Sequence, residues 1–106
     1  MASFRDIVSQ RRLLLDGSMA TMIRRLALSE EQYRGARLKN HPVSLSGNYD
    51  ILNITAPEII SSIHLQYLEA GADVIETNTF NPNELSQRRY HTSEDATEMH
   101  LLAARI

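Results

Sequence analysis

Two polar clusters hold the residue types here that best suit binding of an amino acid. Each follows an apolar run, and their members are Asp16, Gly17, Ser18, Glu76, Asn78 and Thr79. An acidic side chain can hold an ammonium group, while Gly lets backbone N–H groups approach a carboxylate closely. The two clusters therefore form a candidate cradle for an amino-acid head group, provided that the fold brings them together.

Both clusters also have an ordinary structural interpretation. An Asp-Gly pair after a strand is often a simple turn. The polar residues 76–79 can likewise satisfy one another's hydrogen bonds at the end of a strand. Residue types alone leave both interpretations open.

Other kinds of chemistry find little support in the chain. The four histidines, His41, His64, His91 and His100, show no metal-ligand spacing, and we expect His64 to be partly exposed on a helix. Ser18 and Ser86 lack a nucleophile-elbow context, and the glycine patterns of phosphate loops and dinucleotide sites are absent. The chain has no Cys, which excludes disulfides, thiolate nucleophiles and Cys-ligated zinc within it. We therefore expect no catalytic residue and no metal site in this chain.

The composition is that of a small, nearly neutral protein. Among its 106 residues, 11 Lys and Arg are outnumbered by 13 Asp and Glu, which argues against a nucleic-acid partner. No segment is apolar enough to span a membrane, and the first ten residues lack the apolar core of a signal peptide. We expect a cytoplasmic protein.

The first half of the chain predicts short elements and one long loop. Residues 1–11 suggest an N-terminal helix capped by Ser3, and residues 12–17 read as a buried strand because their apolar run is continuous. A helix is expected over residues 19–26. Residues 27–53 have no sustained period, so we interpret them as a loop that is functional or insertional.

The second half shows clearer signals. Residues 55–58 suggest a capping box with Pro57 in the first helical turn, and Gly71 suits the end of that helix. A β-branched strand is expected over residues 72–80. A last helix should begin at Thr92 or Ser93 and bury the face that carries Ala96, Met99 and Ala103. Alternating strands and helices predict a parallel α/β architecture, in which both polar clusters would end strands at one rim.

Four motifs in the same order resemble one known family. They are LLLDGSMATMI (residues 13–23), YRG (33–35), GNYDILNITAPE (47–58) and YLEAGADVIETNTF (67–80). Together they resemble the start of the homocysteine-methyltransferase module of cobalamin-dependent methionine synthases, and the similarity covers residues 12–106. Two positions depart from the family pattern, namely Ala20, where the family usually has Gly, and Pro82.

The resemblance implies a fold and a chemistry. The fold would be an incomplete (β/α)8 TIM barrel, with the first two βα units in residues 12–106. In the family, zinc held by three Cys activates the homocysteine thiol, which takes a methyl group from methylcobalamin; methyltetrahydrofolate then recharges the cobalamin. The residues carried over, all around the homocysteine head group, are Asp16, Gly17, Ser18, Glu76, Asn78 and Thr79.

The same resemblance predicts that this chain is a fragment, inactive by itself. We expect neither zinc nor cobalamin to bind it, and its partners would be homocysteine and the remaining barrel, folate and cobalamin modules of a parent chain. Unpaired strands should make it self-associate or leave its ends poorly ordered. Two alternatives remain: a stand-alone binding or interaction module, and a methyltransferase that uses betaine or S-methylmethionine.

Overall fold

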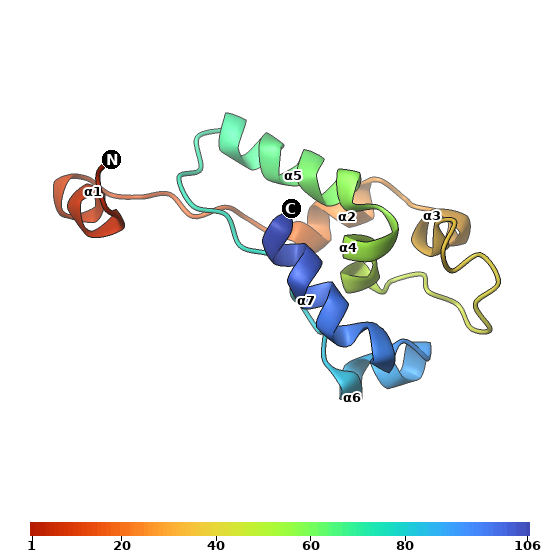
Figure 1. The fold of residues 1–106 in the computed structure, drawn as a ribbon. Coiled ribbons are helices and arrows are strands. Elements are labelled where there is room, and N and C mark those ends of the chain that lie inside the picture. Colours follow the sequence, from red (N-terminus) through yellow and green to blue (C-terminus); the bar gives the residue numbers. More distant parts are fainter.

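A computed structural model describes residues 1–106 and consists of short helices joined by turns and extended segments (Figure 1). The α-helices are α1 (Phe4–Gln10), α2 (Met19–Arg25), α3 (Glu30–Arg34), α4 (Leu52–Thr55), α5 (Pro57–Glu69), α6 (Glu84–Gln87) and α7 (Ala96–Arg105). The 3-10 turns are η1 (Tyr49–Ile51), η2 (Arg88–Tyr90) and η3 (Ser93–Asp95). None of these helices combines the length and the apolar character that crossing a membrane would require.

The structure contains no β-sheet, so the predicted α/β fold, an incomplete (β/α)8 TIM barrel, is wrong. The two predicted strands lie side by side and run parallel, but they share a single bridge between Leu15 and Val74. Leu14 and Leu15 are 63% and 55% exposed, whereas the strand interpretation required them to be covered on both faces. Two extended segments without further neighbours bury too little to extend the pairing.

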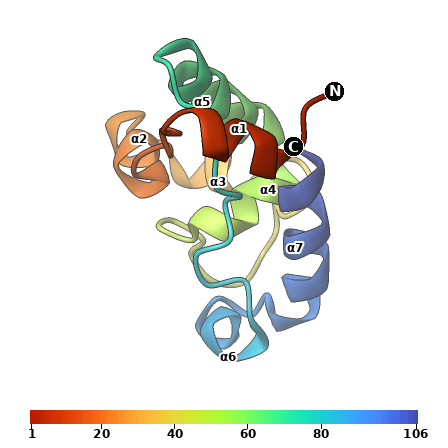
Figure 2. The same cartoon turned by 90° about the vertical axis from the view of Figure 1, so that its left-hand side faces the viewer.

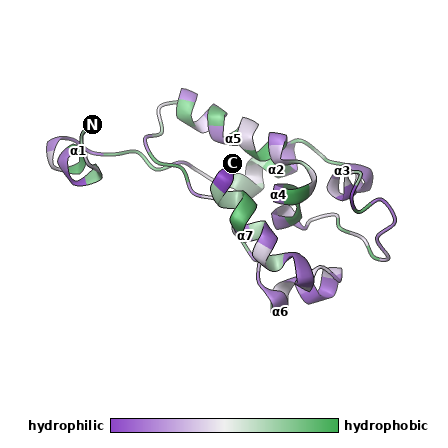
Figure 3. Cartoon of the chain, viewed as in Figure 1, coloured by the Kyte–Doolittle hydropathy of each residue, from purple (hydrophilic) through white to green (hydrophobic).

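A small apolar core lies around α4. Nine buried side chains form it, namely Ile23, Tyr33, Leu45, Ile51, Leu52, Ala56, Ile60, Ile63 and Met99. Helix α4 contacts α3, α5 and α7, and Figure 2 shows α5 and α7 on either side of it. Figure 3 shows strongly hydrophobic parts on α4 beside a hydrophilic one, whereas α6 is mostly hydrophilic. The core thus depends on helix packing.

Helix α1 stands apart from this core. Figure 1 shows it at the end of an extended segment, away from the other helices, and none of its residues is buried. It begins after Ser3, whose hydroxyl accepts the N–H of Asp6 while the Asp6 carboxylate accepts the N–H of Ser3. The radius of gyration is 15.5 Å, compared with about 13 Å for a compact domain of this size. The chain is accordingly elongated.

All four predicted helices are present, as α1, α2, α5 and α7. The predicted start of the last helix at Thr92 or Ser93 is wrong, because α7 begins at Ala96 after the 3-10 turn η3. The buried face of α7 carries Ala96, Met99 and Ala103, as its sequence pattern predicted. Pro57 opens α5, but the predicted capping box is wrong, because the hydroxyl of Thr55 donates to the carbonyl of Ile51.

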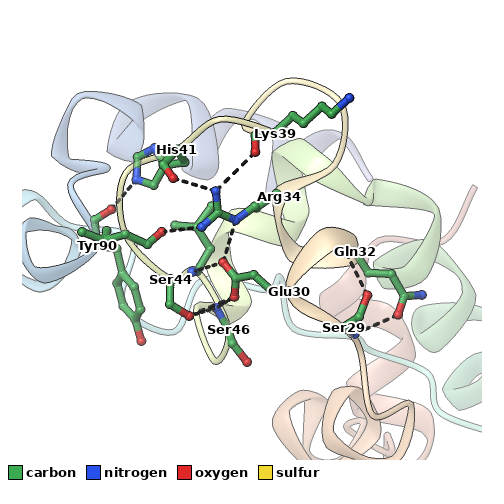
Figure 4. A network of polar contacts seen from close by, with 11 residues as sticks. Ser29, Glu30, Gln32, Arg34, Lys39, His41, Ser44, Ser46 and Tyr90 are labelled. Carbon is green, nitrogen blue, oxygen red and sulfur yellow. Dashed lines mark hydrogen bonds and ion pairs between the residues drawn. The ribbon is translucent and has the colours of Figure 1, made fainter.

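Residues 27–53 are more ordered than predicted. Helix α3 was not predicted, because its five residues are too few to show a helical period. Helix α3 presents an ion pair, Glu30 and Arg34, whose nearest atoms are 2.9 Å apart. The Arg34 guanidinium donates to the carbonyl oxygens of Lys39, His41 and Val43 (Figure 4). Arg34 therefore fixes residues 39–43 of the loop.

The Glu30 carboxylate fixes residues 44–46 of the same loop. It accepts the N–H groups of Leu45 at 2.7 Å and Ser46 at 2.9 Å, and the hydroxyl of Ser44 at 2.9 Å. Burial raises the pKa of Glu30, but these hydrogen bonds and the one from Arg34 together outweigh burial and lower the pKa to about 2. The ionised carboxylate therefore stabilises the loop that leads into η1 and α4.

Candidate functional site

The two polar clusters line one open cavity of about 650 Å³. Its walls are residues 16–20 on one side and residues 76–80 on the other. All six predicted site residues belong to these walls. The parallel bridge between Leu15 and Val74 explains this arrangement, because the segments that follow a parallel pair leave it at the same end. The volume is within the range of about 300–1,000 Å³ that is usual for small-molecule sites.

Asp16 and Glu76 place two carboxylates at this cavity. One oxygen of Asp16, Oδ2, accepts the backbone N–H of Glu76 at 3.1 Å, while Oδ1 has no partner. The Glu76 side chain is exposed and forms no ion pair. The cavity therefore offers a carboxylate oxygen from each segment to a cationic group.

Gly17 packs closely against Tyr67 of α5. A Cβ atom at this position would lie 3.0 Å from Oη and 3.1 Å from Cε1 of Tyr67. The Tyr67 hydroxyl also donates to the carbonyl of Ser18 at 3.0 Å. Tyr67 thus holds residues 16–20 against α5. A residue without a side chain at position 17 therefore suits this contact as well as the close approach of a ligand carboxylate. The backbone N–H groups of Gly17 and Ser18 form no hydrogen bond within the chain.

Three hydroxyl groups surround the same cavity. The Ser18 hydroxyl caps α2 by accepting the N–H of Thr21 at 3.1 Å, which leaves its own hydrogen free to donate. The Oγ1 atoms of Thr77 and Thr79 are 2.9 Å apart, so one of these hydroxyls donates to the other. At least one threonine hydrogen is therefore free for a ligand.

Asn78 serves mainly to anchor the second segment. Its side chain is 3% exposed, and its amide donates to the carbonyl of Tyr49 at 2.9 Å and to Oδ1 of Asn53 at 3.0 Å. Both amide hydrogens are thus used, and only Oδ1 of Asn78 remains for a ligand.

Comparison with known protein families gives a match over most of the chain. A model of the family described as homocysteine S-methyltransferase matches residues 13–106, which include both walls of the cavity. The chain belongs to the homocysteine S-methyltransferase family. The resemblance found in the sequence motifs is thereby confirmed at the level of the family, whose activity is the methylation of homocysteine.

Two residues that position the site in this family member escaped the sequence analysis. The buried carboxylate of Asp50 accepts the N–H of Phe80 at 2.7 Å and that of Asn81 at 3.1 Å. Asn53 donates to the carbonyl of Asn78 at 2.8 Å. Burial raises the pKa of Asp50, although the N–H groups of Asn81 and Phe80 oppose this. The available signal was their spacing, since residues three apart on a helical segment share one face.

His64 differs from its prediction. It is 5% exposed, although partial exposure was expected, and its Nδ1 atom has no hydrogen-bond partner. Burial lowers its pKa, which favours the neutral ring at neutral pH. His64 is therefore a buried neutral residue of α5.

The zinc chemistry that the family resemblance implies does not fit the residues of this chain. No group of three His, Cys, Asp or Glu side chains lies close enough to hold a metal ion. The chain also has no Cys, and thiolates are the ligands that the resemblance implies. The side chains around the cavity thus offer partners for an ammonium and a carboxylate group, and none of the thiolates that the resemblance implies as zinc ligands.

Proposed function

We propose that this chain binds the amino-acid head group of homocysteine, as part of a methyltransferase of the cobalamin-dependent methionine synthase type. One observation carries the proposal: two segments within the family match, far apart in sequence, line the same cavity with carboxylates, hydroxyls and unpaired N–H groups. Such a mixture suits a zwitterion, which needs acceptors for its ammonium and donors for its carboxylate.

The proposed orientation follows from these groups. The ligand ammonium binds between Oδ1 of Asp16 and the Glu76 carboxylate. The ligand carboxylate accepts the N–H groups of Gly17 and Ser18, together with the free hydroxyl hydrogen of the Thr77–Thr79 pair. Asp50 and Asn53 act as positioning residues, because they hold residues 76–80 in place and do not themselves contact the head group.

The finer identity of the parent enzyme rests on the resemblance. The GNYDILNITAPE stretch (residues 47–58) supports the cobalamin-dependent type, in which methylcobalamin is the methyl donor and 5-methyltetrahydrofolate recharges it. Since the chain offers no fitting zinc ligands, we expect it to bind homocysteine without methylating it. Incubation with methylcobalamin and homocysteine should yield no methionine, and turnover with stoichiometric zinc would contradict this expectation.

The binding proposal is tested by titrating the ¹⁵N-labelled chain with L-homocysteine and following its amide resonances. We expect the shifts to concentrate on residues 16–20 and 76–80. Two analogues separate the contacts: 4-mercaptobutanoate lacks the amino group, and 3-mercaptopropylamine lacks the carboxylate. Both should bind more weakly than homocysteine, because each leaves half of the cradle unpaired.

Variants then assign the ammonium contact. Asp16→Asn should weaken homocysteine binding by about 10-fold and should leave the affinity for 4-mercaptobutanoate nearly unchanged. Glu58→Gln removes an exposed carboxylate at the start of α5 and serves as the matched control. Equal losses in the two variants, or shifts confined to residues outside the cavity, would refute the assignment.

A further inference from the structure

His64 is a buried ionisable side chain that the proposed binding contacts do not use. It is 5% exposed, and its Nδ1 atom has no hydrogen-bond partner. Buried polar atoms in folded proteins nearly always have a partner, so an unpartnered ring nitrogen is unusual. The neutral ring carries a hydrogen on one nitrogen only, and protonation adds a hydrogen to the other. His64 can therefore take up a proton without losing a hydrogen bond at Nδ1.

Helix α5 places His64 beside the first wall of the candidate site. Tyr67 of the same helix donates its hydroxyl to the carbonyl of Ser18 at 3.0 Å and packs closely against Gly17. His64 and Tyr67 are three residues apart, and side chains at this spacing share one face of a helix. His64 thus lies on the face of α5 that contacts the segment directly after Asp16.

Asp16 is the one charged group that acts on the His64 ring. Burial lowers the pKa of His64, and the negative charge of Asp16 opposes this effect. Helix α4 (Leu52–Thr55), which packs against α5, has no ionisable side chain. On α5 itself, Glu58 and Glu69 are exposed to solvent. The charge of His64 is therefore coupled to the carboxylate that is proposed to bind the ligand ammonium.

We propose that protonation of His64 weakens homocysteine binding, because the imidazolium ring and the ligand ammonium share the negative charge of Asp16. This inference rests on the proposed function, in which Asp16 contacts the ammonium. When His64 is neutral, the whole charge of Asp16 acts on the ligand. When His64 is protonated, its positive charge offsets part of that charge and repels the ammonium.

The direction of the pH dependence follows from the burial of the ring. Burial lowers the pKa of His64 from its ordinary value of 6.5, so the ring is neutral at neutral pH and takes up a proton only in acid. The affinity for homocysteine should therefore be highest above pH 6.5 and should fall as the pH decreases. Coupling between two binding events is reciprocal, so bound homocysteine should in turn lower the pKa of His64.

The reciprocal effect is tested on the native chain by NMR. The Cε1–H resonance of His64 is followed between about pH 8 and pH 5, the range in which histidines titrate, without ligand and with saturating L-homocysteine. We expect homocysteine to lower the pKa of His64, whereas 4-mercaptobutanoate, which lacks the ammonium, should not lower it. Amide shifts at residues 16–20 and 76–80 without a lower pKa of His64 would overturn this inference and leave the proposed function intact. Absence of those amide shifts would overturn both.

The dissociation constant of homocysteine provides the second test. From about pH 8 to pH 5 the native chain should lose about 5-fold in affinity, a value at the lower end of coupling between sites. A constant affinity over this range would overturn the inference.

His64→Gln keeps a polar side chain of similar size that cannot ionise, so its loss over the same pH range should be less than about 2-fold. His91→Asn is the matched control, because His91 is exposed and has a φ of +55°, which Asn tolerates; it should keep the native pH dependence. Circular dichroism verifies the helices of each variant, and the NMR titration of the native chain decides the matter if His64→Gln does not fold. Equal pH dependence in the two folded variants would overturn the role of His64.

Discussion

Asn53 links the core to the second wall of the candidate site, and its replacement should both destabilise the fold and disturb the site. The side chain is fully buried. Its amide donates to the carbonyl of Asn78 at 2.8 Å and to that of Met99 at 3.1 Å, and its Oδ1 accepts the Asn78 amide at 3.0 Å. Asn53→Ala removes these three hydrogen bonds at once.

The expected magnitude follows from that count. A buried hydrogen bond contributes about 1 kcal/mol net, so Asn53→Ala should lower the free energy of unfolding by about 3 kcal/mol. That is a large share of the roughly 5–15 kcal/mol typical of a folded domain. Asn53→Asp keeps an acceptor for the Asn78 amide but loses both donors, and it buries a carboxyl group. Its loss should therefore be at least as large.

Urea unfolding followed by circular dichroism at pH 7 measures these losses. Asn40→Ala is the control, because Asn40 is exposed and forms no hydrogen bond; its effect should stay within about 0.5 kcal/mol. In folded Asn53→Ala, the amide resonances of Thr77 and Thr79 should also shift, because their segment has lost its anchor. Unfolding midpoints that coincide for Asn53→Ala and Asn40→Ala would refute this account.

Three further predictions concern stability and packing. The pKa of Glu30 falls from 4.5 to about 2 on folding, so its contribution is present above about pH 5 and is lost as the pH falls toward 2. Because this carboxylate is 30% exposed and solvent screens it, its contribution to the free energy of unfolding should be about 2 kcal/mol. Urea unfolding between pH 2 and 7 should show the loss of this contribution in the native chain and in Glu31→Gln, but not in Glu30→Gln. Gly17→Ala should destabilise by about 1–3 kcal/mol in the same assay through overpacking against Tyr67, and no change would show that the ring moves away freely. Met99→Ala should cost about 2–5 kcal/mol because its side chain is fully buried in the core; a loss below about 1 kcal/mol would contradict the packing around α4.

The sequence predicted those features that depend on neighbouring residues. Helices α2, α5 and α7 were found because their apolar spacing and end signals are local. The same holds for the two ends of α5, which were also predicted from local sequence. Pro57 stands at its start, and Gly71, with φ of +110°, lies just beyond its end. The motifs also indicated the correct family, because their order and spacing can be read directly from the sequence.

Only the tertiary structure decided what covers each segment. The run at residues 13–15 looks like a buried strand, yet burial requires partners, and the chain supplies a single bridge at Val74. The burial of His64 and the contact of Gly17 with Tyr67 were equally invisible. An apolar pattern states that a residue can be buried; which residue covers it depends on contacts between distant positions.

The candidate site divides in the same way. Local chemistry singled out Asp16 and Glu76, since a carboxylate after an apolar run is visible in the sequence. Their placement around one cavity, and the anchoring of the second wall by Asp50 and Asn53, are properties of contacts across 25 or more positions. Residue types determine which interactions are possible, and the long-range path of the chain determines which of them form.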